Sequence, residues 1–467
     1  MRYVSTRGAA PSREFDDVLL AGLAEDGGLF VPETWPVFSP AEWRALRGQP
    51  YAELAARVMA PFMTGGAIGF DDLQAITRAS YRGFDHAAVV PLVQLEPSLF
   101  VLELFHGPTL AFKDLALQVA GRLFDHVLSA RDERVTIVGA TSGDTGSAAI
   151  EACRDRLRVD IAILHPEGRT SEVQRRQMTT VKARNVLNIA LSGTFDDCQD
   201  LVKAMFADAP FRTELRLSAV NSINWARIAG QIPYFAAAAL ALGAPDRPVA
   251  VAVPTGNFGN ILAAWAARQM GLPIERFIVG SNANDILARF LAANDMRTAG
   301  VVETVSPSMD IQVSSNFERL LFEALGRDAP ETARTMVDFR ASGTMKVASE
   351  VWQAVRRDFA GLALDDAATL AEIARIRAES GYIADPHTAI GIAAARAAAP
   401  VGVPVIAAAT AHPAKFPEAM HRAIGIRPGL PPRLDDLYDR QEHFVRAGNS
   451  LGEVETLVRH FAHRNDA

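Results

Sequence analysis

Lys113 stands between a segment typical of a strand and the start of an expected helix. Residues 99–105 indicate the strand, Gly107-Pro108 favours a turn, and apolar residues recur at helical spacing over 113–131. The carboxyl end of a strand is where open α/β sheets bind ligands. A cation is disfavoured at the positive end of a helix, and a lysine that loses its proton more easily is a better nucleophile. Taken alone, a solvated lysine in an ordinary first turn is the simpler interpretation.

A loop of small residues follows the expected strand 135–138 and opens an expected helix over 145–155. Small residues let a ligand approach the backbone, and the free N–H groups of a helix start attract anions. The pattern is neither a Walker loop, nor GxGxxG, nor a GxSxG elbow. It therefore favours a small anion such as a carboxylate, with an empty tight turn as the equal alternative. The residues concerned are Thr141, Ser142, Gly143, Asp144 and Thr145.

A second glycine-rich turn lies between the expected strand 249–253 and the expected helix 260–270. The same physics makes it a cradle for a phosphate. Either turn alone could be empty, but two such turns and a lysine are all expected at the same edge of a sheet. Three unrelated turns there would be a less economical explanation. The cradle residues are Gly256, Asn257, Phe258, Gly259 and Asn260.

A cluster of hydrogen-bond donors follows the expected strand 215–220. Asn221, Ser222 and Arg227 combine an amide, a hydroxyl and a guanidinium, which suits a phosphate dianion. The alternative is a helix cap by Asn224 with an arginine on the surface.

The late strand expected over 403–408 also ends in polar residues. Thr410 offers a neutral hydroxyl, and His412 is expected to be structural. The chain has 10 histidines, but neither an HExxH motif nor a paired histidine spacing. We therefore assign no metal.

Strands alternate with helices after residue 92, which predicts βαβ units and mostly parallel sheets flanked by helices, an α/β fold. The strands are expected at 99–105, 135–138, 160–164, 186–190, 215–220, 249–253, 277–281 and 403–408. The helices are expected at 113–131, 145–155, 171–179, 195–206, 225–241, 260–270, 285–294, 316–325 and 364–377.

The ends of the chain differ from this central part. Residues 1–91 indicate a mainly helical region, with helices at 15–23, 41–46, 51–63 and 70–82 and a short strand after Gly27-Gly28. We expect residues 92–415 to form the catalytic core in two subdomains, with 141–220 mostly in the smaller one. Residues 416–467 are expected to be a helical C-terminal extension.

The composition indicates a soluble globular protein of two or three domains, since 49% of the 467 residues are hydrophobic and 22% are charged. A net charge of −7 argues against nucleic acid as the partner. Cys153 and Cys198 show no CxxC spacing, and no apolar run is long enough for a signal sequence or a membrane span. We expect a cytoplasmic protein that contacts neither nucleic acid nor membrane. The oligomeric state stays open.

The chain resembles the threonine synthase family in five segments. They are 106–114 (HGPTLAFKD), 142–146 (SGDTG), 221–227 (NSINWAR), 255–260 (TGNFGN) and 410–416 (TAHPAKF). The segments 3–8 and 26–30 are similar to the longer branch of the family, so the resemblance covers nearly the whole chain. It implies a pyridoxal-phosphate (PLP) enzyme of fold type II, the tryptophan-synthase-β-like type. Such enzymes convert O-phospho-L-homoserine and water into L-threonine and phosphate.

The resemblance also implies roles for the motif residues. Lys113 would be the Schiff-base lysine and the general base and acid, and Thr410 would meet the pyridine nitrogen. Gly256, Asn257, Phe258, Gly259 and Asn260 would hold the cofactor phosphate. Thr141, Ser142, Gly143 and Thr145 would bind the substrate carboxylate, and Asn221, Ser222 and Arg227 the substrate phosphate.

Asp144 departs from the shorter branch of the family, which has Asn beside the phenolic oxygen of the cofactor. An aspartate there would repel that oxygen unless it is protonated or turned away, so Asp144 is a site residue without an assigned role.

Two other functions stay open. One is a serine or threonine dehydratase, which would share Lys113 and the glycine loop. The other is a doubly wound module that binds a ligand without catalysis.

Overall fold

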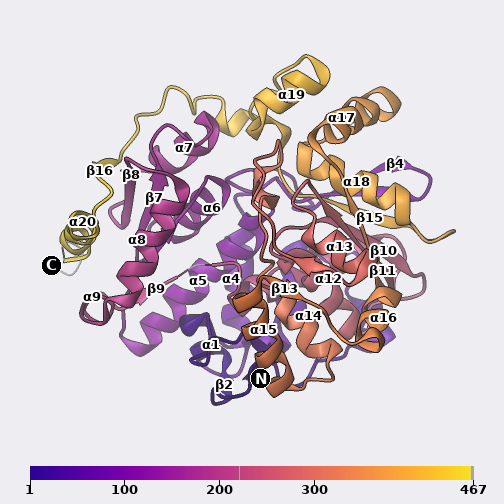
Figure 1. Cartoon of the computed structure of the whole chain (residues 1–467), viewed down its shortest axis with the longest axis horizontal. Helices are drawn as coiled ribbons and strands as arrows, with labels where there is room; N and C mark the ends of the chain where they lie inside the picture. The colour runs from indigo at the N-terminus through magenta and orange to yellow at the C-terminus, as the bar shows by residue number, and fades with distance from the viewer. Residues whose placement is uncertain (220, 464–467) are drawn as a thin grey trace.

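The computed structural model describes residues 1–219 and 221–463, whose strands form two large sheets (Figure 1). The larger sheet has the order β14-β11-β10-β15-β5-β4, and its neighbours are parallel except for the pair β4 and β5. The smaller sheet, β16-β8-β7-β6-β9, is parallel throughout. The larger sheet comprises β4 (Leu92–Glu96), β5 (Leu99–Glu103), β10 (Val249–Pro254), β11 (Ile274–Ser281), β14 (Phe359–Ala363) and β15 (Val405–Ala409). The smaller one comprises β6 (Val135–Ala140), β7 (Val159–Pro166), β8 (Val186–Leu191), β9 (Leu217–Ser218) and β16 (Val445–Ala447).

Helices cover both sheets, as the alternating sequence pattern predicts. Strands β7, β10 and β15 are buried along their whole length, which explains their unbroken apolar runs. In Figure 1, α6, α7 and α8 surround the smaller sheet, and α12, α13 and α18 surround the larger one. The helices of this part are α5 (Lys113–Arg131), α6 (Asp144–Cys153), α7 (Glu172–Thr179), α8 (Phe195–Ala207), α9 (Ala209–Glu214), α10 (Trp225–Ala229), α11 (Ile232–Ala241), α12 (Gly259–Gln269), α13 (Ile286–Ala293), α14 (Phe317–Ala324), α15 (Ala329–Ser342), α16 (Ser349–Asp358), α17 (Asp366–Ser380) and α18 (Pro386–Ala398).

Most expected elements are present, with small shifts of their ends. The helix expected over 225–241 is divided into α10 and α11, because Gly230 ends the first and Pro233 lies in the first turn of the second, where its missing N–H costs nothing. Helices α9, α15, α16 and α18 and strands β4 and β14 were not predicted. The strand expected over 215–220 is only Leu217–Ser218, and its expected end, Val220, lies outside the described residues.

The N-terminal region contains a small antiparallel sheet, β2-β1-β3, besides four helices. Its Trp35 ring lies 5.9 Å from that of Trp225 and 5.3 Å from that of Trp265, so the region shares a hydrophobic core with α10 and α12. Its elements are β1 (Arg2–Ser5), β2 (Arg13–Glu14), α1 (Phe15–Ala21), β3 (Phe30–Pro32), α2 (Pro40–Ala45), α3 (Tyr51–Met63) and α4 (Phe70–Tyr81).

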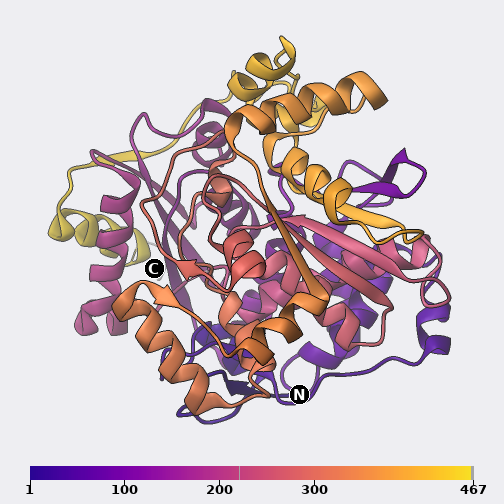
Figure 2. The same cartoon turned by 45° about the vertical axis from the view of Figure 1, so that its right-hand side comes forward.

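The end of the chain returns to the smaller sheet. After α19 (Pro417–Ile424) the chain crosses to β16, which pairs with β8, and then forms α20 (Leu451–His463) beside α8. Figure 2 shows this crossing as the yellow trace. The helical interpretation of the chain's end missed β16, which is only three residues long. Within residues 1–219 and 221–463, no helix combines the length and apolar character needed to cross a membrane. A short ribbon, β12 (Met296–Arg297) and β13 (Thr344–Met345), completes the strands.

Candidate active site

The predicted site residues come from the carboxyl ends of two sheets. Strands β5, β10 and β15 belong to the larger sheet, whereas β6 pairs with β7 and β9 in the smaller one. The expectation of a single sheet edge was therefore wrong, since no ladder joins β6 to β5. The two sets of loops nevertheless meet, because Lys113 Nζ lies 3.4 Å from Asp144 Oδ2.

Lys113 is held beside the end of β15 by backbone hydrogen bonds. Phe112 N donates to Thr410 O at 2.9 Å, and His412 N donates to Leu110 O at 3.0 Å. The Lys113 side chain is 11% exposed. Its burial, and then the charges of Lys415 and Arg227, lower the pKa of Lys113, while Asp144 opposes the change. The structure thus supports the expected easier loss of a proton, with burial as the main cause.

Asp144, the first residue of α6, is buried between two lysines. Its Oδ1 lies 2.7 Å from Lys415 Nζ and accepts a hydrogen bond from Gln174 Nε2 at 2.8 Å. Its Oδ2 accepts from Ser308 Oγ at 3.2 Å and faces Lys113. Burial alone would raise the pKa of Asp144, but the two ammonium groups and the hydrogen bonds from Lys415 and Gln174 hold it well below its usual range. Asp144 is therefore ionised, and the two lysines balance its charge. This arrangement differs from both expected ones, a protonated aspartate and one that is turned away.

The rest of the small-residue loop is shaped by Thr141. Its Oγ1 accepts hydrogen bonds from Gly143 N and Gly146 N, both at 2.9 Å. Gly143 has a φ of +150°, and a Cβ there would lie 2.6 Å from the Gln174 side chain. Ser142 is exposed and Thr145 half-buried. The loop can thus present backbone N–H groups to an anion, while the Thr141 oxygen is engaged in closing it.

The glycine-rich turn after β10 leads directly into α12. Phe258 has a left-handed φ of +63°, and the helix begins at Gly259. The first N–H groups of a helix have no partners within it and can bind an anion. A Cβ on Gly256 would lie 3.0 Å from Ser308 O, so the small residue permits this close approach.

Asn316, which the sequence interpretation did not select, joins this turn to the donor cluster. Its Nδ2 donates to Asn257 O at 2.9 Å and to Ser222 O at 3.1 Å. Arg319 in turn donates to Asn316 Oδ1, to Ile223 O at 2.6 Å and to Phe30 O at 2.9 Å. The N-terminal region thereby supports the loop that carries the predicted phosphate ligands.

Arg227 is buried rather than on the surface, so the surface alternative was wrong. It is 4% exposed, and its Nε and Nη1 have no hydrogen-bond partner within the described residues. Burial lowers the pKa of Arg227 to about 10, which still leaves it charged at neutral pH. Asn260 Nδ2 is likewise buried without a partner in this part of the chain, while Tyr234 Oη donates to Asn260 Oδ1 at 2.9 Å. Asn224 caps α10 by accepting a hydrogen bond from Ala226 N, so this part of the alternative interpretation was right.

The residues present fit pyridoxal phosphate. A buried lysine with a lowered pKa can react with its aldehyde, and the glycine turn at α12 can hold its phosphate. The buried Thr410 directly follows the neighbouring strand β15. The unpartnered donors of Arg227 and Asn260 call for an anion. In the described ranges, no three His, Cys, Asp or Glu side chains gather as a metal site.

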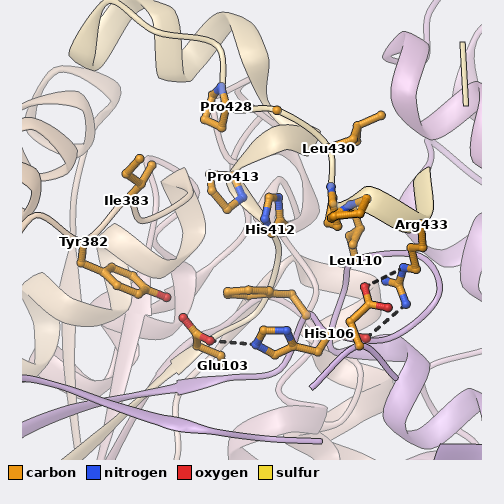
Figure 3. A pocket seen from close by; sticks show the side chains of 15 residues that line it. Glu103, His106, Leu110, Tyr382, Ile383, His412, Pro413, Pro428, Leu430 and Arg433 are labelled. Carbon is orange, nitrogen blue, oxygen red and sulfur yellow. Dashed lines mark hydrogen bonds and ion pairs between the residues drawn. The ribbon is translucent and has the colours of Figure 1, made fainter. Parts of the chain in front are cut away.

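A cavity of about 710 Å³ lies between the segment around His106 and Leu110 and the segment around Pro428 and Arg433, as Figure 3 shows. It is lined by His106, Leu110 and His412 but by none of the residues predicted for the site. His106 Nε2 lies 2.7 Å from Glu103 Oε2 in its wall. His412 Nδ1 accepts from Ala414 N at 3.2 Å, and burial lowers the pKa of His412 to about 4. Both histidines therefore have contacts of a structural kind.

Comparisons with known proteins agree along the whole chain. Three families match: "Threonine synthase N terminus" over residues 2–81, "Pyridoxal-phosphate dependent enzyme" over 85–341 and "Threonine synthase, C-terminal" over 388–458. A threonine synthase of Pseudomonas aeruginosa is 54% identical over 466 residues, which are 99% of each chain. A PLP-bound threonine synthase from Brucella melitensis superposes with a TM-score of 0.98 at 52% identity, over 99% of both chains. Threonine synthase from yeast gives a TM-score of 0.92 at 36% identity, over 99% of this chain and 98% of that one.

Proposed function

The chain belongs to the threonine synthase family, and on this premise we propose that its buried site converts O-phospho-L-homoserine and water into L-threonine and inorganic phosphate. It is a pyridoxal-phosphate-dependent lyase of fold type II. The observation that carries the choice of substrate is Arg227, a buried guanidinium with two nitrogens that lack partners among the described residues. Such a group suits a phosphate that is absent from the free protein.

Lys113 has two roles in this proposal. It binds the cofactor covalently, and its released amine moves protons at Cα and Cβ of the substrate. Burial lowers the pKa of Lys113, so a larger fraction of its amine than of an exposed lysine is unprotonated near neutral pH and able to accept a proton. Bound pyridoxal phosphate supplies an electron sink for the charge that develops at the substrate.

The other residues hold the two reactants. Gly256, Asn257, Phe258, Gly259 and Asn260 hold the cofactor phosphate at the start of α12, which the free N–H groups of that turn support. Thr410 meets the pyridine nitrogen with a neutral hydroxyl. Such a hydroxyl cannot hold a proton there as an aspartate would, which restrains side reactions such as transamination. Asp144 would lie beside the phenolic oxygen, with its charge balanced by Lys415 and Lys113.

The substrate is held at both of its charged ends. The loop of Thr141, Ser142, Gly143 and Thr145 binds the carboxylate through the start of α6. Asn221, Ser222 and Arg227 bind the phosphate. A dehydratase acting on an unphosphorylated amino acid would have no need for the buried charge of Arg227, which is why phosphohomoserine is the favoured substrate.

A phosphate-release assay with O-phospho-L-homoserine tests the function, beside Lys113→Ala, which should abolish turnover. The purified protein should be yellow, and borohydride should fix the cofactor on Lys113. A colourless protein without added mass on Lys113 would exclude the enzyme altogether. Activity on serine or threonine, without phosphate release from phosphohomoserine, would support the dehydratase instead.

Two further points belong to the proposal. We place the protein in the cytoplasm, which its free, buried cysteines Cys153 and Cys198 support. We also propose that it binds no nucleic acid, because its net charge of −7 disfavours binding to a polyanion. Fractionation of cells and a binding assay with DNA and RNA test the two statements.

A further inference from the structure

Lys415 is a fully buried lysine in the turn that follows β15. Its side chain is 0% exposed, its Nζ donates to Thr109 O at 2.7 Å, and the same atom lies 2.7 Å from Asp144 Oδ1. Taking an ammonium group out of water is costly unless a counter-charge and hydrogen bonds compensate it. The carboxylate of Asp144 is the counter-charge, so the two buried charges depend on each other.

The contacts of Asp144 are divided between its two oxygens. Oδ1 is occupied by Lys415 and Gln174, whereas Oδ2 is left to Ser308 and Lys113. Because both oxygens belong to one rigid carboxylate, the contacts at Oδ1 orient Oδ2. Lys415 therefore fixes the direction in which Asp144 faces Lys113, although within the described residues no hydrogen bond joins Lys415 to Lys113.

The charges around Lys113 come from three elements. Asp144 of α6 favours the proton on Lys113, while Lys415 after β15 and Arg227 of α10 disfavour it. Asp114, next along α5, instead accepts hydrogen bonds from Thr109 N and Thr109 Oγ1, both at 2.7 Å. One carboxylate thus lies between two ammonium groups. The charge of Lys415 offsets the attraction that Asp144 exerts on the proton of Lys113.

We propose that Lys415 is a positioning residue, which balances the charge of Asp144 and holds Oδ2 against the nitrogen of Lys113 that carries the cofactor. The proposal rests on the proposed function at one point, the attachment of the cofactor to Lys113. It explains how an aspartate can replace a neutral asparagine beside the cofactor. The acid and the buried lysine form one unit, and each requires the other.

The test is a pH titration of the visible absorbance of the cofactor in the holoenzyme. Lys415→Met replaces the cation by an uncharged side chain of similar length. The nitrogen of Lys113 should then hold its proton more tightly, so the midpoint of the absorbance titration should rise by about one pH unit or more. Asp144→Asn removes the anion at constant shape, and its midpoint should fall by about as much. The double variant removes both charges, and its midpoint should lie between those of the two single variants and close to that of the unchanged protein.

Thermal unfolding of the same four proteins separates charge from packing. Lys415→Met leaves a buried carboxylate without its main partner, so it should unfold at a lower temperature than the double variant. If Lys415→Met does not fold, the difference in titration midpoint between Asp144→Asn and the double variant still gives the direct charge effect of Lys415 on Lys113, and the double variant should have the higher midpoint. Lys203→Met is the control, because Lys203 forms an exposed ion pair with Asp200 and should change neither measurement.

Two results would overturn the proposal. An unchanged midpoint in Lys415→Met would mean that the lysine only ties down the Thr109 carbonyl. Shifts of the two single variants in the same direction would contradict the opposed charges. Failure of the proposed function gives a different result, because the unchanged protein would then show no visible absorbance from a cofactor bound to Lys113.

Discussion

Replacing Arg227 by methionine should weaken substrate binding while leaving the free protein as stable as before. In the free protein Arg227 is 4% exposed, and two of its nitrogens lack partners in the described ranges, so its charge is poorly compensated. Methionine fills similar space without that charge. Replacing a buried charge by an apolar side chain is often neutral or stabilising. The free energy of unfolding of the cofactor-free protein should therefore be unchanged or higher.

The loss of affinity follows from the same two nitrogens. A hydrogen bond to a charged group contributes about 1.5–3 kcal/mol, so losing two costs about 3–6 kcal/mol. Since about 1.4 kcal/mol corresponds to a factor of ten, KM for O-phospho-L-homoserine should rise about 100-fold or more. Inorganic phosphate should inhibit the unchanged enzyme by competition with the substrate, and this inhibition should be lost in Arg227→Met.

Three measurements check this reasoning: phosphate release against substrate concentration, inhibition by added phosphate, and thermal unfolding without cofactor. Arg212→Met is the matched control, because Arg212 is exposed and donates to the carbonyl of Phe206. An unchanged KM in Arg227→Met would remove Arg227 from the phosphate site. A large fall in the unfolding temperature would show that its role is structural.

Two further predictions concern the pyridine nitrogen and the pH dependence of stability. Thr410→Asp should increase transamination or racemisation, measured by product analysis, and an unchanged product profile would count against the role of Thr410. Burial raises the pKa of Asp114 from 3.8 to about 6, so the folded protein holds this proton more tightly than the unfolded chain. The resulting stabilisation is complete below about pH 4 and is lost as the pH rises through about 6, a change of about 3 kcal/mol. Asp114→Asn should flatten this decline in chemical denaturation at pH 4 to 7, and an equally steep decline would refute the assignment.

Local patterns were sufficient for the helices and strands with strong periodicity. Helix α5 spans Lys113–Arg131 as predicted, because its apolar spacing and the turn before it are both local signals. Strand β16 has only three residues and forms because β8 has a free edge, which no local pattern can show. The separation of β6 from β5 is also a property of the pairing between strands, and the expectation of two subdomains did not by itself reveal that the site residues come from two sheets.

The site was predictable where residues follow a strand in a recognisable turn. Lys113, Asp144 and Arg227 were selected as candidates in this way, and the structure brings Lys113 and Asp144 together. Lys415 and Asn316 were missed because their importance comes from contacts with residues far away in the sequence. Lys415 lies within the segment 410–416, where its neighbours alanine, proline and phenylalanine are the one local signal for a buried lysine.

The contacts of Arg319 have a consequence for how the chain can be divided. This one guanidinium holds the carbonyl of Phe30 in the N-terminal region and the carbonyl of Ile223 beside the substrate loop. A chain shortened to begin at the α/β core would lose the first of these acceptors and uncover Trp225. The N-terminal segment is therefore not an interchangeable module, and it should unfold together with the core in a single cooperative transition.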